Sequence, residues 1–211
     1  MTTVADGLFQ YGGMPVGPGI PPFIRTGSKF FFVDPVNGLD GNKGTSPDRA
    51  FASLYKAHYM MTAGNNDVAF LIGDGTTTNT ARLSAANSVA SGNGLTTGEL
   101  IWSKNATHLV GVSSGTTNSR ARMAPPTGTY TAATFGSNTC FTVSGSGCYI
   151  ANVSMSSSFT TGDVAEITMV VSGSYNRFEN VTAGHTSAAA IGGTAARSLK
   201  VTTGGENIFR N

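Results

Sequence analysis

The chain has 211 residues and a formal net charge of +2, and only 11% of its residues are charged, against roughly 25% in an ordinary globular domain. With 39% apolar residues and 12 phenylalanines it has the material for a core, which argues against a disordered chain. No basic cluster suggests a nucleic-acid partner and no apolar run approaches the ~18 residues of a membrane span, so we expect neither nucleic-acid binding nor membrane insertion.

Residues 1–28 predict an extended anchoring arm. Residues 12–22 are rich in glycine and proline, which exclude a helix or an inner strand. The arm nevertheless carries more large apolar side chains than a free linker does: Leu8, Phe9, Tyr11, Met14, Ile20, Phe23 and Ile24. We expect these side chains to pack on a partner, and packing against the arm's own domain is the alternative. The first residues lack the basic and apolar regions of a signal peptide, so we expect release by lysis.

Residues 29–66 predict a strand, a turn region and a short capping helix. The strand is expected over residues 30–33 and the turns over 34–45. Ser46 and Pro47 together are a helix start, with serine as the N-cap and proline at the first helical position. One apolar helix face follows at positions i, i+3, i+4 and i+7, formed by Phe51, Leu54, Tyr55 and His58, and the glycine and asparagines at 64–66 end it.

The turn region offers oxygen atoms that calcium ions bind. Asp34, Asn37, Asp40 and Asn42 lie close together in the sequence. Their spacing matches no calcium-binding pattern, and Asp and Asn also form turns by bonding to nearby backbone groups. We therefore expect turn chemistry here and no metal site.

From residue 67 the pattern predicts strands, with β-helix coils over residues 67–211. Apolar strands are expected at 68–72, 100–102 and 108–112, with residues 76–98 as an excursion loop. Cys140 and Cys148 are either two small core residues, which we favour, or a disulfide that closes a short loop.

The last third of the chain repeats. Residues 141–153, 169–181 and 199–211 each read as a strand, a Gly-containing turn, a second strand and an asparagine. The equivalent residues are spaced 28 and 31 positions apart: Val143, Val171 and Val201; Ile150, Phe178 and Phe209; Asn152, Asn180 and Asn211.

Short strands at this period predict a right-handed parallel β-helix, because each coil needs its neighbours to bury a core. Equivalent residues would then lie about 4.8 Å apart in columns, with the two apolar sets inside. The asparagine would occupy a bend, since asparagine tolerates left-handed backbone angles. A β-sandwich with coincidental turns is the alternative. Because Asn211 falls on a bend position, we expect the stack to continue or to be capped by a partner.

The segment FVDPVNGLDGNKGTSPDRAF, residues 32–51, resembles the opening of pectate-lyase-like β-helix proteins. The glycine- and proline-rich arm before it makes the chain similar to bacteriophage particle proteins. The resemblance implies an all-β fold with a capping helix, a homotrimer, and a virion protein such as a tail spike, tail fibre or capsid decoration. We expect a non-enzymatic structural role, assembly in the host cytoplasm, and contact with capsid or tail proteins through the arm.

Enzymes with this fold cleave polysaccharides with clustered acidic groups on an outer face. The candidates here are Asp163, Glu166, Arg177 and His185, and we expect scattered surface charge instead of a catalytic site. The alternative function is a tail spike that binds or depolymerises a host glycan. A secreted carbohydrate-active enzyme would need an export signal. No phosphate loop is present, and we expect no cofactor.

Overall fold

The computed structural model describes residues 2–4, 8–11, 14–16, 27–74, 76–92, 96–113, 121–126, 132–157, 167–185, 197–203 and 205–210. Most of the regular structure in these residues is short β-strand. The helical segments are a 3-10 turn at Pro47–Arg49 and the short helices α1 (Leu54–Met60), α2 (Ala85–Ala90) and α3 (Ala132–Phe135). None of the described helices is long and apolar enough to cross a membrane.

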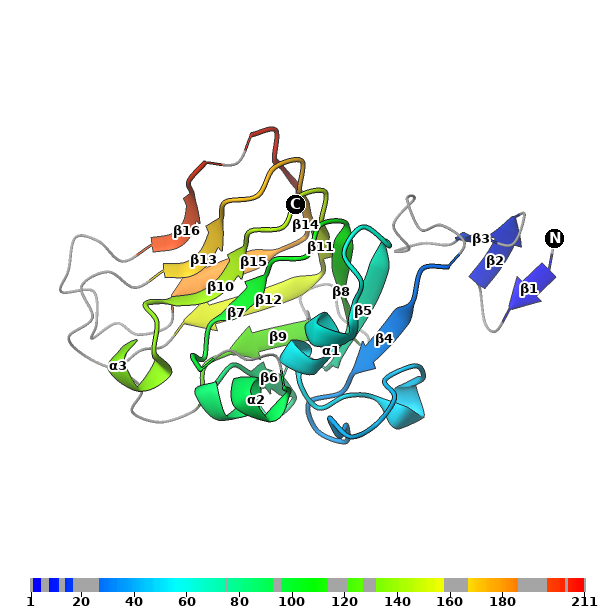
Figure 1. The fold of residues 1–211 in the computed structure, drawn as a ribbon, viewed down its shortest axis with the longest axis horizontal. Helices are drawn as coiled ribbons and strands as arrows, with labels where there is room; N and C mark the ends of the chain where they lie inside the picture. Colours follow the sequence, from blue (N-terminus) through cyan, green and yellow to red (C-terminus); the bar gives the residue numbers. More distant parts are fainter. Residues whose placement is uncertain are drawn as a thin grey trace.

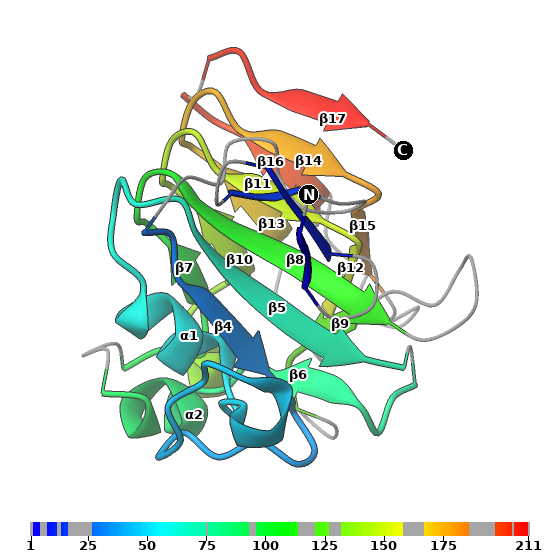
Figure 2. The same cartoon turned by 90° about the vertical axis from the view of Figure 1, so that its right-hand side faces the viewer.

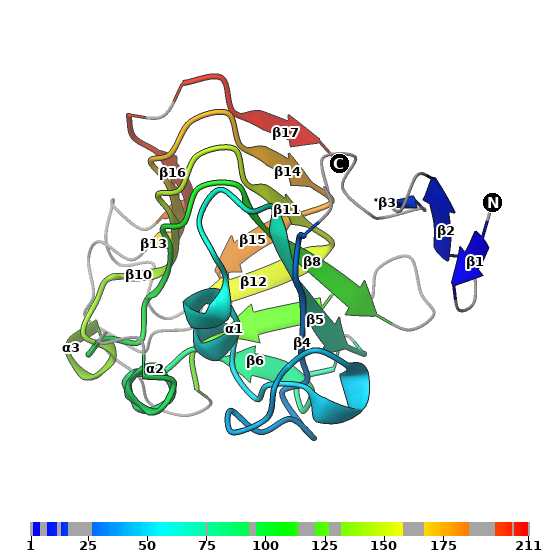
Figure 3. The same ribbon diagram turned by 45° about the vertical axis from the view of Figure 1, so that its right-hand side comes forward.

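The arm contains a small antiparallel sheet in the order β1-β2-β3, formed by β1 (Thr2–Val4), β2 (Leu8–Tyr11) and β3 (Met14–Val16). Pro15 lies in the edge strand β3, where a residue without an N–H group is tolerated. Four of the apolar arm residues lie in these strands, namely Leu8, Phe9, Tyr11 and Met14. Ile20, Phe23 and Ile24 lie outside the described residues. Figures 1 and 3 show β1–β3 standing apart from the other sheets.

The remaining strands form three parallel sheets. The first contains β7 (Leu100–Trp102), β10 (Thr139–Val143), β13 (Ile167–Val171) and β16 (Arg197–Val201). The second contains β4 (Phe30–Val33), β5 (Asp67–Gly73), β8 (Thr107–Ser113), β11 (Tyr149–Ala151), β14 (Arg177–Glu179) and β17 (Ile208–Arg210). The third contains β6 (Thr80–Arg82), β9 (Ala121–Ala124), β12 (Val153–Ser157) and β15 (Thr182–His185).

From β7 onward the chain passes through the first, second and third sheets in turn and then returns to the first. Each strand pairs in parallel with the strands of the preceding and following passes. In Figure 2 the stack runs from α1 and α2 at the bottom to β17 at the top. The fold is therefore mostly β, with parallel sheets and few helices.

The repeated apolar residues pair with one another in the sheets. Ile150 pairs with Phe178 and Phe178 with Phe209, in the second sheet. Val143, Val171 and Val201 pair in the same way in the first sheet. The lower members are buried, but Phe209 and Val201, on the last strands, are 44% and 46% exposed. The columns that the sequence predicts are thus present, and their upper ends are open.

The repeated asparagines occupy the bend between the second and third sheets. Asn152 and Asn180 have φ angles of 55° and 52°, in the left-handed region. The Asn180 Nδ2 donates to Asn152 Oδ1 at 2.8 Å, so successive bends are joined by an amide–amide hydrogen bond. Asn211 lies outside the described residues.

The α-helix begins later than the sequence predicts. Ser46 makes no capping hydrogen bond, and Ser53 is the N-cap, accepting from the Lys56 N–H. Phe51 lies before the helix, where its N–H donates to the Phe32 carbonyl at 2.8 Å. Backbone pairing with β4 takes this residue out of the helix, because tertiary hydrogen bonds outweigh a weak local helical preference.

The prediction of an excursion loop over residues 76–98 is wrong. This segment contains β6 and α2, and the Ser84 side chain caps α2 by accepting from the Asn87 N–H. The whole third sheet is absent from the predicted strands. Its strands are rich in small and polar residues, such as Ser154, Ser156 and Ser157 in β12, and the buried Ser157 shows that even the inward positions are not all apolar.

Candidate functional site

The outer face of the second sheet is the most distinctive surface of the described chain. Side chains alternate along each strand, and Phe31, Leu71, Leu109 and Ile150 point into the main core. The alternate positions point outward, and from β4 to β11 they are uncharged: Phe30, Phe32, Val68, Phe70, Ile72, His108, Val110, Val112, Tyr149 and Ala151. We call these ten residues the outer apolar face. Figure 2 looks onto this sheet.

Six residues of the outer apolar face form a hydrophobic cluster separate from the main core: Val68, Val110, Tyr149 and Ala151, with Phe30 and Phe70 packed against them. The Phe70 ring stacks on those of Phe30 and Phe32, with ring centroids 5.9 and 5.4 Å apart. The three rings are only partly buried, and Val112 is 47% exposed. The other half of the face is buried, because Val68, His108, Val110, Tyr149 and Ala151 are each at most 9% exposed, so only part of it reaches water.

The other two sheets differ in their outer faces. The outward positions of the third sheet are polar, including Arg122, Ser154 and Thr182, which form one column. The first sheet has a mixed outer column that passes from Thr142 through Val170 to Lys200. An apolar exterior is therefore a property of one sheet and not of the whole stack.

A polar cluster of Tyr149, Arg177 and Glu179 borders the outer apolar face. The Tyr149 hydroxyl donates to Glu179 Oε2 at 2.7 Å, and Arg177 Nη2 lies 3.2 Å from the same oxygen. The Arg177 guanidinium also lies over the Tyr149 ring, 5.8 Å from its centroid. Glu179 points outward beside the inward Phe178.

The electrostatics of this cluster favour a fixed charge pattern. The hydrogen bond from Tyr149 lowers the pKa of Glu179, and Arg177 lowers it further. Burial, followed by the bond to Glu179, raises the pKa of Tyr149 to about 12. Glu179 is therefore ionised and Tyr149 protonated near neutral pH. A general acid needs a raised carboxyl pKa, so Glu179 is not suited to that role.

The four catalytic candidates are not assembled into one site in the described part of the chain. Asp163 and Glu166 lie outside the described residues. Arg177 is on β14 in the second sheet and is paired with Glu179. His185 ends β15 in the third sheet, opposite Ser157, so the two described candidates are on different sheets.

The turn residues of the motif are occupied by hydrogen bonds within the protein. The Asp34 carboxylate accepts from the backbone N–H groups of Val36 and Asn37, at 2.9 and 3.0 Å. Asp40 accepts from Ser53 through both its N–H and its hydroxyl. Within the described ranges, no group of three or more His, Cys, Asp or Glu side chains is placed to hold a metal ion.

The buried histidines and cysteines serve the core. Burial lowers the pKa of both His58 and His108 to about 3, so both rings are neutral. His58 Nε2 accepts from the Ser103 N–H, as expected for a packed or capping residue. Cys140 and Cys148 are both buried and are not joined by a disulfide, in agreement with the two core residues that we favoured.

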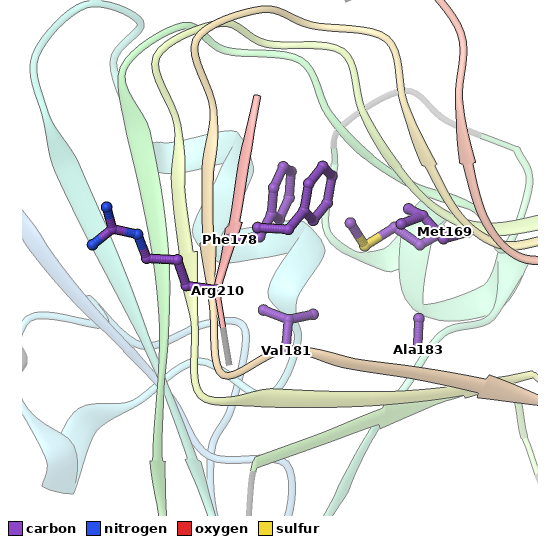
Figure 4. Close-up of a pocket in the computed structure, with 7 residues that line it drawn as sticks. Met169, Phe178, Val181, Ala183 and Arg210 are labelled. Carbon is purple, nitrogen blue, oxygen red and sulfur yellow. The ribbon is translucent and has the colours of Figure 1, made fainter. Parts of the chain in front are cut away.

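An apolar pocket of about 390 Å³ opens at the β17 end of the stack. It is lined by Met169, Phe178, Val181, Ala183, Leu199, Phe209 and Arg210. The Phe178 and Phe209 rings stack with centroids 4.6 Å apart, and Figure 4 shows the Arg210 side chain pointing away from them. The pocket is the upper end of the interior columns, so it continues the core and has no convergent polar groups of a substrate site.

Comparison with family models, with curated proteins and with solved structures found no match to this chain. The resemblance to phage β-helix proteins therefore stays a prediction. The outer apolar face is not among the surfaces predicted from the sequence, although a signal for it is present. Strands such as FFFV and VAFLI are apolar at successive positions, which indicates that both faces of the sheet are apolar.

Proposed function

We propose that the chain folds as a right-handed parallel β-helix with an N-terminal capping helix and arm. The regular passage through three parallel sheets supports this, together with the pairing of Ile150, Phe178 and Phe209 at equivalent positions. Each coil would bury its apolar side chains only when stacked on its neighbours, which is the behaviour of a solenoid.

Designed disulfides test this stacking. Thr142 and Val170 pair on adjacent strands of the first sheet, and paired residues are within the Cα range of about 4.4–6.8 Å that a disulfide bridges. The double variant Thr142→Cys/Val170→Cys should therefore cross-link on oxidation. Thr142→Cys/Val112→Cys, on two different sheets, is the matched control. Cross-linking of the control alone would contradict the proposed stack.

We further propose that the protein is a non-enzymatic structural component of a bacteriophage particle, docked through residues 1–28 and homotrimeric. The observation that supports this most is the rigid parallel stack attached to a separate apolar arm with its own small sheet. Such a stack is stiff and projects away from its anchor, as a spike, fibre or decoration does. The engaged carboxylate of Glu179 supports a role without catalysis.

Antibody labelling tests the virion role. A serum raised against the purified chain should label phage particles purified from lysed cells. Deletion of residues 1–28 in the phage genome should remove the chain from particles while leaving its circular dichroism spectrum unchanged. A full-length chain that remains entirely in the particle-free fraction would overturn the proposal.

A tail spike that binds or depolymerises host polysaccharide is the second candidate. The partly exposed rings of Phe30, Phe32 and Phe70, and the charged pair Arg177 and Glu179 on another strand of the same sheet, favour it, because sugar rings bind aromatic faces and charged hydrogen-bonding groups. Host polysaccharide should then bind the wild type, and Phe70→Ser should weaken this binding. Depolymerisation that is lost in Asp163→Ala/Glu166→Ala would establish the enzymatic alternative.

A further inference from the structure

We propose that the β17 end of the stack is a docking site for an extended strand of another protein, which adds to β17 and carries an acidic side chain opposite Arg210. The inference rests on the proposed parallel stack and adds the chemistry of a partner that the stack can bind. It does not depend on the arm or on where in a particle the chain sits.

The first argument is the open edge of β17, the terminal strand of the second sheet. The Ile208 N–H donates to the Asn176 carbonyl at 2.8 Å. The Arg210 carbonyl accepts from the Asn180 N–H, also at 2.8 Å. Both residues therefore turn their backbone groups towards β14. Successive residues of a strand direct these groups to opposite edges, so the N–H and C=O of Phe209 point to the open edge, where an added strand would find a donor and an acceptor.

The second argument is the apolar surface beside this edge. Phe209 is 44% exposed, whereas Phe178, the equivalent residue one coil below, is 1% exposed. The same difference separates Leu199, at 41%, from Met169, at 1%. The lower residue of each pair has a coil above it, and the upper residue has none among the described strands. A further strand would therefore remove apolar surface from water, which is favourable.

The pocket of about 390 Å³ gives room for a second apolar side chain of the same segment. It opens beside Phe209 and reaches down to Val181 and Ala183 in the coil below (Figure 4). Edge strands are commonly blunted by proline or by an inward charge, which keeps other strands from pairing with them. β17 contains no proline, and its inward residue is Phe209. Edge and pocket together have the form of a strand-addition site, in which main-chain bonds hold the segment and pockets select its side chains.

The third argument is charge, which defines the partner. From residue 197 to residue 210 the sequence carries three basic residues and one acidic residue. Opposite charges already face each other in the outward column of the second sheet, because Arg210 pairs with Glu179 on β14. An acidic residue opposite Arg210 on the added strand would continue this alternation, whereas like charges at that position are unfavourable. A second copy of this chain would instead bring another basic surface to this end, so a different protein is the better occupant.

The chain itself provides a probe for this site. β14 pairs with the lower edge of β17 and places Phe178 opposite Phe209. The next residue, Glu179, lies opposite Arg210. A synthetic peptide of residues 174–183 therefore has an apolar residue for the inward position and an acid for the position over Arg210. Its binding to the full chain is measured by the fluorescence anisotropy of a label at its N-terminus, and the matched control peptide carries Glu179→Lys.

The peptide should bind the wild type saturably, with a dissociation constant below about 1 mM. Arg210→Glu should weaken this binding at least about 10-fold, because it brings like charges together on adjacent strands. The Glu179→Lys peptide should bind Arg210→Glu more tightly than it binds the wild type. Lys43→Glu, a charge reversal at an exposed residue of the turn region, is the matched control protein and should bind as the wild type does. The circular dichroism spectrum should be the same for all three proteins.

A second measurement uses the unaltered chain, so it does not depend on how a variant folds. The same peptide with a benzoyl group on its phenylalanine ring should cross-link on irradiation. Mass spectrometry should place the cross-links on β17 or on residues that line the pocket.

Equal binding of both peptides by the wild type and by Arg210→Glu, or cross-links confined to other parts of the chain, would overturn the proposal. Absence of saturable binding at about 1 mM peptide would do so as well. A wild type whose copies cross-link to one another through β17 would assign this end to a second copy and also overturn it. The Thr142→Cys/Val170→Cys variant decides the stack separately, so a stack that binds no peptide would overturn this inference alone.

Discussion

Replacing Gly44 by alanine should destabilise the N-terminal end of the fold strongly. Gly44 belongs to the Gly-Thr turn of the motif over residues 32–51, and its φ angle is +70°. A Cβ atom built at this residue would lie 2.1 Å from Cε2 of Phe51, whose side chain is completely buried. The turn therefore needs glycine for two separate reasons, backbone angle and space.

Together the backbone angle and the lack of space set the expected loss in the free energy of unfolding. Placing a residue with a Cβ atom in the left-handed region costs about 1 kcal/mol or more. Overfilling a packed site costs about 1–3 kcal/mol, because the ring must shift against its neighbours. Phe51 has little freedom to do so, since its ring packs against Phe31 and its backbone pairs with Val33. We expect Gly44→Ala to lower the free energy of unfolding by about 2–4 kcal/mol, and Tm by about 4–16 °C.

Thermal unfolding followed by circular dichroism measures this effect. Gly41→Ala, three residues earlier in the same turn region, is the matched control because nothing lies within 4 Å of its added Cβ. Its Tm should change by less than about 2 °C. The double variant Gly44→Ala/Phe51→Leu separates the two reasons, since the smaller side chain relieves the overlap but not the backbone strain. We expect it to be more stable than the sum of the single changes implies.

Strict additivity of Gly44→Ala and Phe51→Leu would show that the two side chains do not compete for space. A Gly44→Ala variant as stable as Gly41→Ala would refute the reasoning altogether. The explanation for glycine at this position of the motif would then have to be sought outside the packing of the turn.

Three further predictions concern the interior. Asn180→Ala should lower the free energy of unfolding by about 2 kcal/mol in urea titrations, because the variant loses the amide hydrogen bond to Asn152 and places alanine at φ 52°. A loss no larger than that of an ordinary surface substitution would argue against a stabilising bond between the asparagine bends. Burial lowers the pKa of His108 to about 3, so the free energy of unfolding should fall as the pH drops from 6.5 towards 3, and the loss should be about 2 kcal/mol at about pH 5. His108→Asn should reduce this dependence of the free energy of unfolding on pH. An unchanged dependence would contradict the role given to His108. Burial raises the pKa of the Cys148 thiol to about 11, so this thiol should react with a thiol reagent at pH 8 only after unfolding. Rapid labelling of the native protein would show that the reagent reaches Cys148 in the folded state.

The positions that sequence reasoning located correctly are those with a local or periodic signal. The strands at 30–33, 68–72, 100–102 and 108–112 correspond to β4, β5, β7 and β8, since their apolar runs are bounded by turn residues. The pairs Ile150–Phe178 and Asn152–Asn180 follow from the spacing of the repeat. The helix start was placed too early, because the backbone pairing of Phe51 with a strand leaves no trace in the spacing of apolar residues.

The sequence by itself determined the β-rich class, the parallel stacking of the last coils and the left-handed asparagine bends, because each depends on residue type at a fixed spacing. Only the tertiary structure decided the third sheet and the outer apolar face. The third-sheet strands are held by hydrogen bonds to neighbouring coils and not by their own composition. Whether an apolar side chain on a strand lies in the core or on the exterior depends on which side its sheet turns towards the stack, and that is fixed only when all the coils are assembled.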